Sequence, residues 1–245
     1  MLAAFAALVL ASTASAEPCQ NVKYENNRYS ICTFDMADTD LRLFLYDGNG
    51  EVFGHFSTLR DALAEQGETL IFAMNAGMYH EDRAPVGHYV EDGETVMRVV
   101  PNAGPGNFGM LPNGIFCIRP GRADVIETSD FVARKPDCTH ATQSGPMLVI
   151  NNNLHPRFLP DSTSRFIRNG VGTSADGSKV VFAISANSVT FHDFATMFRD
   201  GLGLPNALFL DGNISRLYAQ DLGRNDAGFS LGPIVGVVKP ASDDS

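Results

Sequence analysis

Polar residues follow two apolar segments at the points where buried strands would end. The run Phe72-Ala73-Met74 leads into Asn75-Ala76-Gly77-Met78-Tyr79, and Ala207-Leu208-Phe209-Leu210 leads into Asp211-Gly212-Asn213-Ile214-Ser215. An amide or carboxylate at a strand end can project into a cleft, while a nearby glycine allows the backbone to turn tightly. The alternative is an Asx-turn, in which the Asn or Asp side chain bonds its own backbone. The pattern is therefore compatible with a site built from two strand ends or with two ordinary turns.

Two further segments combine polar side chains with flexible backbone. Gln143-Ser144-Gly145-Pro146 precedes a predicted strand, and Phe166–Gly172 places Arg168 beside Gly170 and Gly172. A guanidinium fork next to accessible backbone N–H groups suits a phosphate, because it donates two charge-assisted hydrogen bonds. An arginine near glycines is also common on loops without a ligand.

Other catalytic templates are absent from the sequence. It has no Gly-x-Ser-x-Gly elbow and no His-Glu-x-x-His pair, and Gly177-Ser178-Lys179 has the wrong order for a nucleotide-binding loop. His80, beside Glu81 and Asp82, is the best candidate for a metal ligand, but such a run is more often a solvated loop. We therefore predict no cofactor and no metal site.

The strands that would position these residues are predicted by short apolar runs separated by Gly, Asn and Asp. These runs predict strands at Tyr29–Phe34, Leu41–Tyr46, Thr69–Met74, Val86–Val90, Gly114–Ile118, Met147–Ile150, Lys179–Ser185, Ala207–Leu210 and Ile234–Val238. Capping-box-like pairs predict two helices, one from Thr58 to Gly67 and one from Thr190 to Gly201. The longest predicted loops are Pro101–Pro112 and Asn151–Gly172. Many strands, few short helices and no linker predict a single α+β domain with mixed sheets.

The amino-terminal residues and the cysteines indicate export. Residues 1–16 combine an apolar run with a small-residue Ala-Ser-Ala end, which is typical of a signal peptide, and residues 17–245 would form the mature domain. Four cysteines in an exported chain predict disulfides, with three possible connectivities. We favour Cys19–Cys32 and Cys117–Cys138, because each closes a short local loop; zinc is disfavoured, since no Cys-x-x-Cys spacing occurs. The expected location is periplasmic or secreted.

Charge and composition exclude some classes of partner. The 245 residues carry 18 basic and 28 acidic side chains, a net charge of −10, with no basic cluster that would bind nucleic acid. No segment approaches the roughly 20 apolar residues of a membrane-spanning helix. We predict no obligate protein partner. Trp is absent, so any sugar stacking would use Tyr or Phe.

Taken in order, the polar clusters resemble the motifs of the phosphodiester glycosidase family. The family patterns Asn-Gly-Gly-Phe-Phe and Gly-Pro-x-Leu are similar to residues 75–79 and 145–148. Its Arg-x-Ala-Ile-Gly and Leu-Asp-Gly-Gly-Gly-Ser are similar to residues 168–172 and 210–215. Pro112–Phe116 and the predicted helix Thr190–Leu202 also fall where bacterial members have similar elements. Ala76 and Asn213-Ile214 replace family glycines, which leaves the substrate open.

The resemblance implies an exported hydrolase that cleaves a sugar-1-phosphodiester, or a related glycosidic bond, in a cell-envelope glycan. Asp211 is the first candidate for the catalytic carboxylate and Asp193 the second, with Arg168 holding the phosphate. Residues expected to contact the carbohydrate or sugar-phosphate substrate are Asn75, Gly77, Tyr79, Asn113, Ser144, Gly145, Arg168, Gly172, Gly212 and Ser215. Two alternatives stay open: a glycan-binding module without catalysis, and a metal-dependent phosphodiesterase that uses His80, Glu81, Asp82 and Asp211.

Overall fold

The described strands form three antiparallel sheets. The computed structural model describes residues 17–211 and 214–241, and within them every strand pairing is antiparallel. The helices there are α1 (Phe56–Glu65), α2 (Thr128–Arg134) and α3 (Phe191–Thr196), which continues as a π-helical turn, Met197–Gly201. The predicted strand-rich α+β class is confirmed, but the sheets are antiparallel where mixed sheets were expected. Parallel neighbours need long, usually helical crossovers, and these described segments contain few helices.

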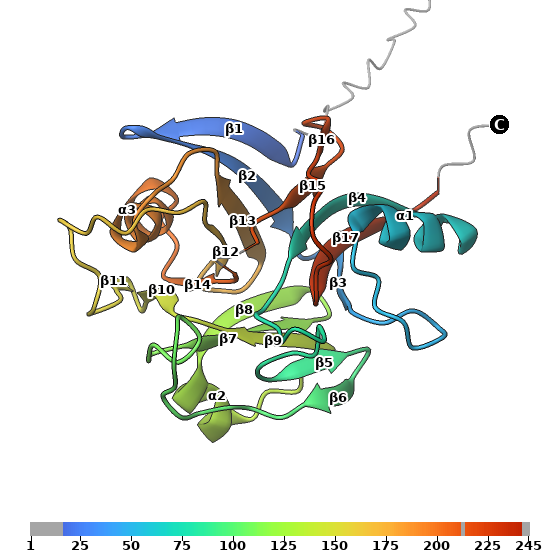
Figure 1. Ribbon diagram of the computed structural model, residues 1–245, viewed down its shortest axis with the longest axis horizontal. Helices are drawn as coiled ribbons and strands as arrows, with labels where there is room; N and C mark the ends of the chain where they lie inside the picture. Colours follow the sequence, from blue (N-terminus) through green and yellow to red (C-terminus); the bar gives the residue numbers. More distant parts are fainter. Residues whose placement is uncertain (1–16, 212–213, 242–245) are drawn as a thin grey trace, which may run out of the picture.

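The largest sheet has seven strands and carries α3 on one face (Figure 1). Its order is β1 (Cys19–Tyr24), β2 (Asn27–Asp35), β13 (Lys179–Ser185), β12 (Asn169–Thr173), β14 (Asn206–Phe209), β10 (Met147–Ile150) and β11 (Asn153–Leu154). Phe194 and Phe198 lie buried on this face among apolar residues of β2, β10, β13 and β14. The Thr190 side chain caps α3 in a capping box with Asp193, as predicted.

The second sheet is covered by α1. Its order is β16 (Arg224–Asn225), β15 (Leu217–Ala219), β4 (Glu68–Asn75), β17 (Ile234–Pro240) and β3 (Asp40–Phe44). The helix begins at Phe56, two residues before the predicted start at Thr58, and its N-cap His55 makes no side-chain capping bond. Burial of Phe56, with Leu59 and Leu63, against this sheet explains the earlier start.

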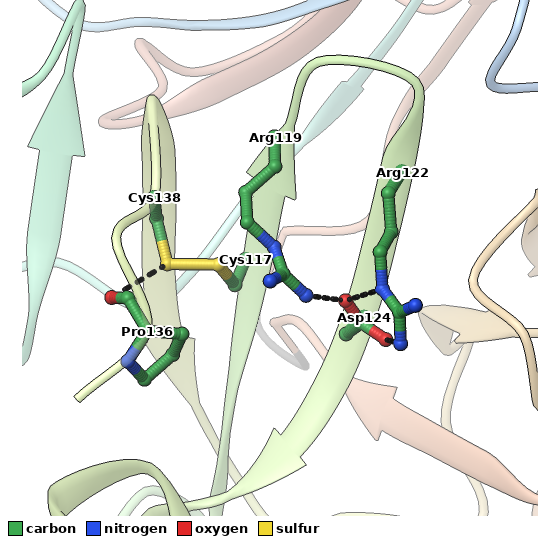
Figure 2. The surroundings of a disulfide bond; sticks show 6 residues. All are labelled: Cys117, Arg119, Arg122, Asp124, Pro136 and Cys138. Carbon is green, nitrogen blue, oxygen red and sulfur yellow. Dashed lines mark hydrogen bonds and ion pairs between the residues drawn. A yellow bond between two sulfur atoms is a disulfide. The ribbon is translucent and has the colours of Figure 1, made fainter. Parts of the chain in front are cut away.

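The third sheet contains one of the two disulfides. Its order is β6 (Glu94–Met97), β5 (Tyr89–Glu91), β9 (His140–Ser144), β7 (Gly114–Arg119) and β8 (Arg122–Glu127). Figure 2 shows the bond from Cys117 to Cys138 and, beside it, Asp124 between two arginines. Arg119 and Arg122 both bind the Asp124 carboxylate, which joins the two strands of the β7–β8 hairpin beside its turn.

The three sheets share one apolar core. Phe182 of β13 contacts Phe72 of β4, with ring centroids 4.8 Å apart, and Phe116 of β7, with centroids 5.8 Å apart. Aromatic side chains bury large apolar areas, so this contact stabilises the junction of all three sheets. The strand ends that carry the candidate site lie around the same junction.

Most sequence-predicted elements occur, with some exceptions. Each of the nine predicted strands overlaps an observed one, and Pro101–Pro112 contains no helix or strand. The prediction that Asn151–Gly172 is a loop is wrong at both ends, where β11 and β12 form. Both favoured disulfides, Cys19–Cys32 and Cys117–Cys138, are present. The predicted signal peptide lies outside the described residues, and none of the helices in the described part of the chain could cross a membrane.

Candidate functional site

Asn75 joins three segments that are distant in sequence. It is the last residue of β4 and is fully buried. Its Oδ1 accepts hydrogen bonds from Asn169 Nδ2 at 2.9 Å and from the Arg216 backbone N–H at 2.9 Å. Asn169 begins β12 and Arg216 directly precedes β15, so one amide brings together the ends of three strands. The Nδ2 of Asn75 has no hydrogen-bond partner among the described residues.

Asn169 also holds the segment that follows β14. Its Oδ1 accepts a hydrogen bond from the Asp211 N–H at 3.1 Å, and Ser215 Oγ donates to the Asp211 carbonyl at 3.1 Å. Ser144, at the end of β9, donates to the Leu210 carbonyl. These bonds fix the backbone on both sides of Asp211, whose side chain is half-buried. Gly212 lies outside the described residues.

Charged groups of both signs surround the Tyr79 phenol. Burial raises the pKa of Tyr79, and the nearby Asp211 carboxylate raises it further, whereas Arg83 and Arg216 act in the opposite direction. The Arg83 guanidinium carbon lies 5.5 Å from the centroid of the Tyr79 ring. Tyr79 therefore remains a protonated phenol at neutral pH, and its hydroxyl donates to the Ser230 carbonyl at 3.5 Å.

A pocket opens beside this cluster. Its volume is about 620 Å³, within the range of sites for small ligands. The pocket is lined by Phe166, Ile167, Ile214, Ser215, Arg216, Asp226, Ala227, Gly228 and Phe229. Ser215 and Arg216 belong to both the pocket and the polar cluster, so a bound molecule would meet both. A separate hollow of about 530 Å³ near His88 and Cys138 contains none of the predicted site residues.

Gly77 and Thr142 form a supporting contact below Tyr79. The Gly77 N–H donates to Thr142 Oγ1 at 3.2 Å. A Cβ at position 77 would lie 2.3 Å from that oxygen, so only glycine allows this approach. Gly77 thus allows the loop after β4 to pack against β9.

Asn113 and Gly145 also support the site from within the protein. Asn113 Nδ2 donates to the Phe108 carbonyl at 2.9 Å, and its Oδ1 accepts from Thr128 Oγ1 at 2.7 Å. A Cβ at Gly145 would lie 2.7 Å from the Asn113 Cβ. The amide of Asn113 is therefore engaged in fixing the loop at residues 101–112, and neither residue lines the pocket.

Arg168 lies on a different face from Asn169. Side chains alternate along a strand, and Asn169 points toward the junction of the sheets, so Arg168 points toward α3. Its guanidinium carbon lies 3.6 Å from the Phe191 ring centroid, and its Nε donates to the Val189 carbonyl at 3.0 Å. The side chain is 2% exposed, and burial lowers its pKa to about 10. The structure does not bring Arg168 together with Asp211.

Asp193 and Gly172 also lie at α3 and its continuation. The Asp193 carboxylate caps the helix and forms an ion pair with Arg165 at 3.2 Å. A Cβ at Gly172 would lie 2.8 Å from Leu204 Cδ1 and 2.9 Å from Phe198 Cδ1, so this glycine permits close packing. Neither residue lines the pocket beside Asp211.

Three residues of the candidate site were not predicted from the sequence: Asn169, Arg216 and Thr142. Asn169 and Arg216 directly adjoin predicted residues, namely Arg168 and Ser215. The signal that would have identified Asn169 is strand alternation. Since this segment was predicted as a loop, the alternation could not be applied.

The metal alternative lacks a ligand cluster in the part of the chain that the structure describes. There, no three His, Cys, Asp or Glu side chains gather in a metal-binding arrangement. Asp82 accepts a hydrogen bond from the Ala84 N–H at 3.0 Å, as in an Asx-turn. His80, Glu81 and Asp82 therefore belong to a tight turn.

Comparison with known proteins finds a matching family and a relative in Escherichia coli. The family model described as phosphodiester glycosidase (NAGPA) matches residues 68–235. The uncharacterized protein YigE of Escherichia coli K12 is 35% identical over 180 residues, which cover 74% of this chain and 70% of YigE.

Two solved structures share the fold. The zebrafish N-acetylglucosamine-1-phosphodiester alpha-N-acetylglucosaminidase catalytic domain, auto-inhibited by its pro-peptide, aligns with a TM-score of 0.60 at 12% identity. That alignment covers 89% of this chain and 81% of the zebrafish chain. A protein of Burkholderia pseudomallei, described as exported, aligns with a TM-score of 0.56 at 12% identity over 86% of this chain and 74% of its own.

Proposed function

Since the chain belongs to the phosphodiester glycosidase family, we propose that it is an exported hydrolase that cleaves a sugar-1-phosphodiester or a related glycosidic bond in a cell-envelope glycan. The observation that carries the proposal is the fixed position of Asp211 at the junction of β4, β12 and β14. It lies beside a phenol and a pocket of ligand size. The two disulfides support an extracytoplasmic location.

Cleavage at an anomeric carbon requires two kinds of assistance. Positive charge develops on the sugar ring in the transition state, and the leaving oxygen must accept negative charge or a proton. Asp211 would stabilise the charge on the ring or transfer a proton. A phosphate is a good leaving group, so a cation at its oxygens reduces the need for a second carboxylic acid. Arg216 is a buried cation that lines the pocket and could supply this charge.

The neighbouring residues would orient the substrate. The phenol of Tyr79 is a hydrogen-bond donor at neutral pH and also presents a ring face to a sugar. Ser215 adds a hydroxyl at the edge of the pocket. Asn75, Asn169 and Ser144 hold the backbone that carries these groups, and such positioning accounts for a large part of enzymatic rate acceleration.

Asp211→Asn tests the proposal. The change is nearly isosteric, so the melting temperature should change little, while loss of the carboxylate should lower turnover by roughly 10²–10⁴-fold. The assay measures sugar release from a panel of aryl glycosides and sugar-1-phosphodiesters, with and without a chelator. Asp61→Asn, on the exposed surface of α1, is the matched control and should retain full activity.

Three outcomes would contradict the proposal or favour one of its alternatives. Unchanged turnover by Asp211→Asn would remove the residue from the mechanism. Binding of the same compounds without any turnover by the wild type would favour the glycan-binding module. Loss of activity in chelator would favour the metal-dependent phosphodiesterase.

A further inference from the structure

Exposed apolar side chains gather at the pocket beside Asp211. Phe229 is 80% exposed, Phe166 53% and Ile167 36%. All three line this pocket, whereas the other large apolar residues exposed in the described part of the chain, Tyr46, Val96, Val132 and Leu159, do not. Single exposed apolar residues are normal, but a group of them at a concave site marks a binding surface.

The wall of the same pocket carries a buried cation. Arg216 is 7% exposed, and a Cβ at Gly228 would lie 2.5 Å from its Nη2, so the glycine makes room for the guanidinium. Among the described residues, no carboxylate lies within ion-pair distance of Arg216. The nearby Asp226 is paired with Arg224 at 2.7 Å and accepts the Leu217 N–H at 3.0 Å.

A desolvated cation without an ion pair attracts an anion. Burial lowers the pKa of Arg216 more than the nearby Tyr79 and Asp226 raise it, as expected for a buried positive charge without an ion pair. Arginine presents a planar fork that matches phosphate oxygens in two places. The pocket thus combines a buried arginine in its wall with an apolar rim.

We propose that this pocket binds an amphipathic phosphate ester, with the phosphate on Arg216 and the hydrocarbon part of the leaving group between Phe166 and Phe229. This inference rests on the proposed function, because the phosphate at Arg216 would be the one released by cleavage beside Asp211. It assigns the leaving group to the class of phosphates that carry an apolar chain. Specificity would then depend on the two phenylalanines as well as on the sugar.

The test compares the binding of ethyl phosphate and hexyl phosphate by calorimetry. The wild type should bind hexyl phosphate at least tenfold more tightly, because the four additional methylene groups become buried at the rim. Phe229→Ser should remove most of this difference and leave the affinity for ethyl phosphate unchanged. Val132→Ser, an exposed apolar position on α2 outside the pocket, is the matched control and should bind both like the wild type. Arg216→Gln should weaken both ligands at least tenfold.

Two results would overturn the inference. One is equal affinity of the wild type for the two phosphates, and the other is an intact chain-length preference in Phe229→Ser. Because Phe229 is exposed, its substitution leaves the folded protein available for measurement even if Arg216→Gln fails to fold. Calorimetry and the turnover assay on the wild type together separate the two proposals: a chain-length preference without turnover retains the pocket and rejects the hydrolase. Turnover without a chain-length preference would retain the hydrolase and reject the proposed role of the pocket.

Discussion

Arg168 and Arg216 are both buried arginines, but their guanidinium groups have different surroundings. Arg168 packs on Phe191 and donates to the backbone carbonyls of Val189 and Ser164. Its hydrogen bonds are thus made within the protein, whereas Arg216 lines a pocket. The sequence favoured Arg168 for phosphate binding because a cation among glycines is a recognisable pattern. The face of the sheet on which each arginine lies depends on strand pairing, and the local sequence pattern carries no information about that pairing.

We predict that Arg168 contributes to stability more than to ligand binding. Arg168→Met should lower the free energy of unfolding by about 2–4 kcal/mol, since it removes charge-assisted hydrogen bonds and a desolvated cation–π contact. Denaturant titration measures this change, and calorimetry with ethyl phosphate at low temperature should give wild-type affinity; hexyl phosphate is unsuitable, because the Arg168 guanidinium carbon lies 5.5 Å from the centroid of the Phe166 ring at the rim. Arg165→Met is the control: Arg165 pairs with Asp193 near the surface and should cost at most about 1 kcal/mol. A stable Arg168→Met variant that no longer binds phosphate would restore the role expected from the sequence.

Among the elements, apolar strands were predictable and polar strands were not. Runs such as Lys179–Ser185 have the alternating or continuous apolar character of a buried strand, and β13 has these bounds. By contrast, β12 reads Asn-Gly-Val-Gly-Thr, a composition typical of loops. Its glycines are required by tertiary packing, because a Cβ at Gly170 would lie 2.7 Å from the Leu208 carbonyl oxygen. The unpredicted strand β12 carries Asn169, which the sequence pattern did not indicate, whereas Ser144 at the end of the unpredicted β9 was expected to contact substrate; the site could therefore be predicted only in part.

The β5–β6 hairpin contains a carboxyl group that should make stability depend on pH. Glu91 accepts a hydrogen bond from the Tyr89 hydroxyl at 2.7 Å, and burial raises its pKa from 4.5 to about 7. The folded state therefore binds a proton more tightly than the unfolded state. The stabilisation is complete below pH 4.5 and is lost as the pH rises toward 7.

Glu91→Gln should flatten this dependence. In the wild type, we expect the contribution of Glu91 to the free energy of unfolding to fall by on the order of 1–2 kcal/mol between pH 4.5 and 7. This value is smaller than the full pKa shift implies, because solvent partly screens the group. Unfolding free energies measured in steps from pH 4.5 to 8 give the slope. Glu94→Gln, at an exposed position in the same hairpin, should keep the wild-type slope. If Glu91→Gln has the same slope as the wild type, the Glu91 carboxyl group is not the source of the pH dependence of stability.

At the scale of the whole molecule, one aromatic cluster connects the three sheets, and two disulfides fix segments within individual sheets. Phe182 contacts phenylalanines from both other sheets within one shared apolar cluster, and each sheet also packs a smaller cluster on its outer face, under α3, α1 or α2. Cys19–Cys32 joins the paired strands β1 and β2, and Cys117–Cys138 joins β7 to the segment before β9. Both pairings were predictable because short loop closures are local in sequence. The meeting of three sheets at Phe182 was not, since it depends on contacts between distant segments.

This shared core predicts one cooperative unfolding transition that shifts as a unit when the disulfides are reduced. The two bridges separate cysteines by 13 and 21 residues, and the loop-entropy model assigns about 3 kcal/mol to each. For a chain of this size, 1 kcal/mol changes the melting temperature by about 2–4 °C, so full reduction should lower it by roughly 10 °C or more. Differential scanning calorimetry of oxidised and reduced protein, with thiols counted by alkylation and mass spectrometry, measures the shift. Two separated peaks in the oxidised protein would contradict the shared core, because one sheet would then unfold without the others. An unchanged melting temperature after complete reduction would show instead that the bridges constrain loops already ordered in the unfolded chain.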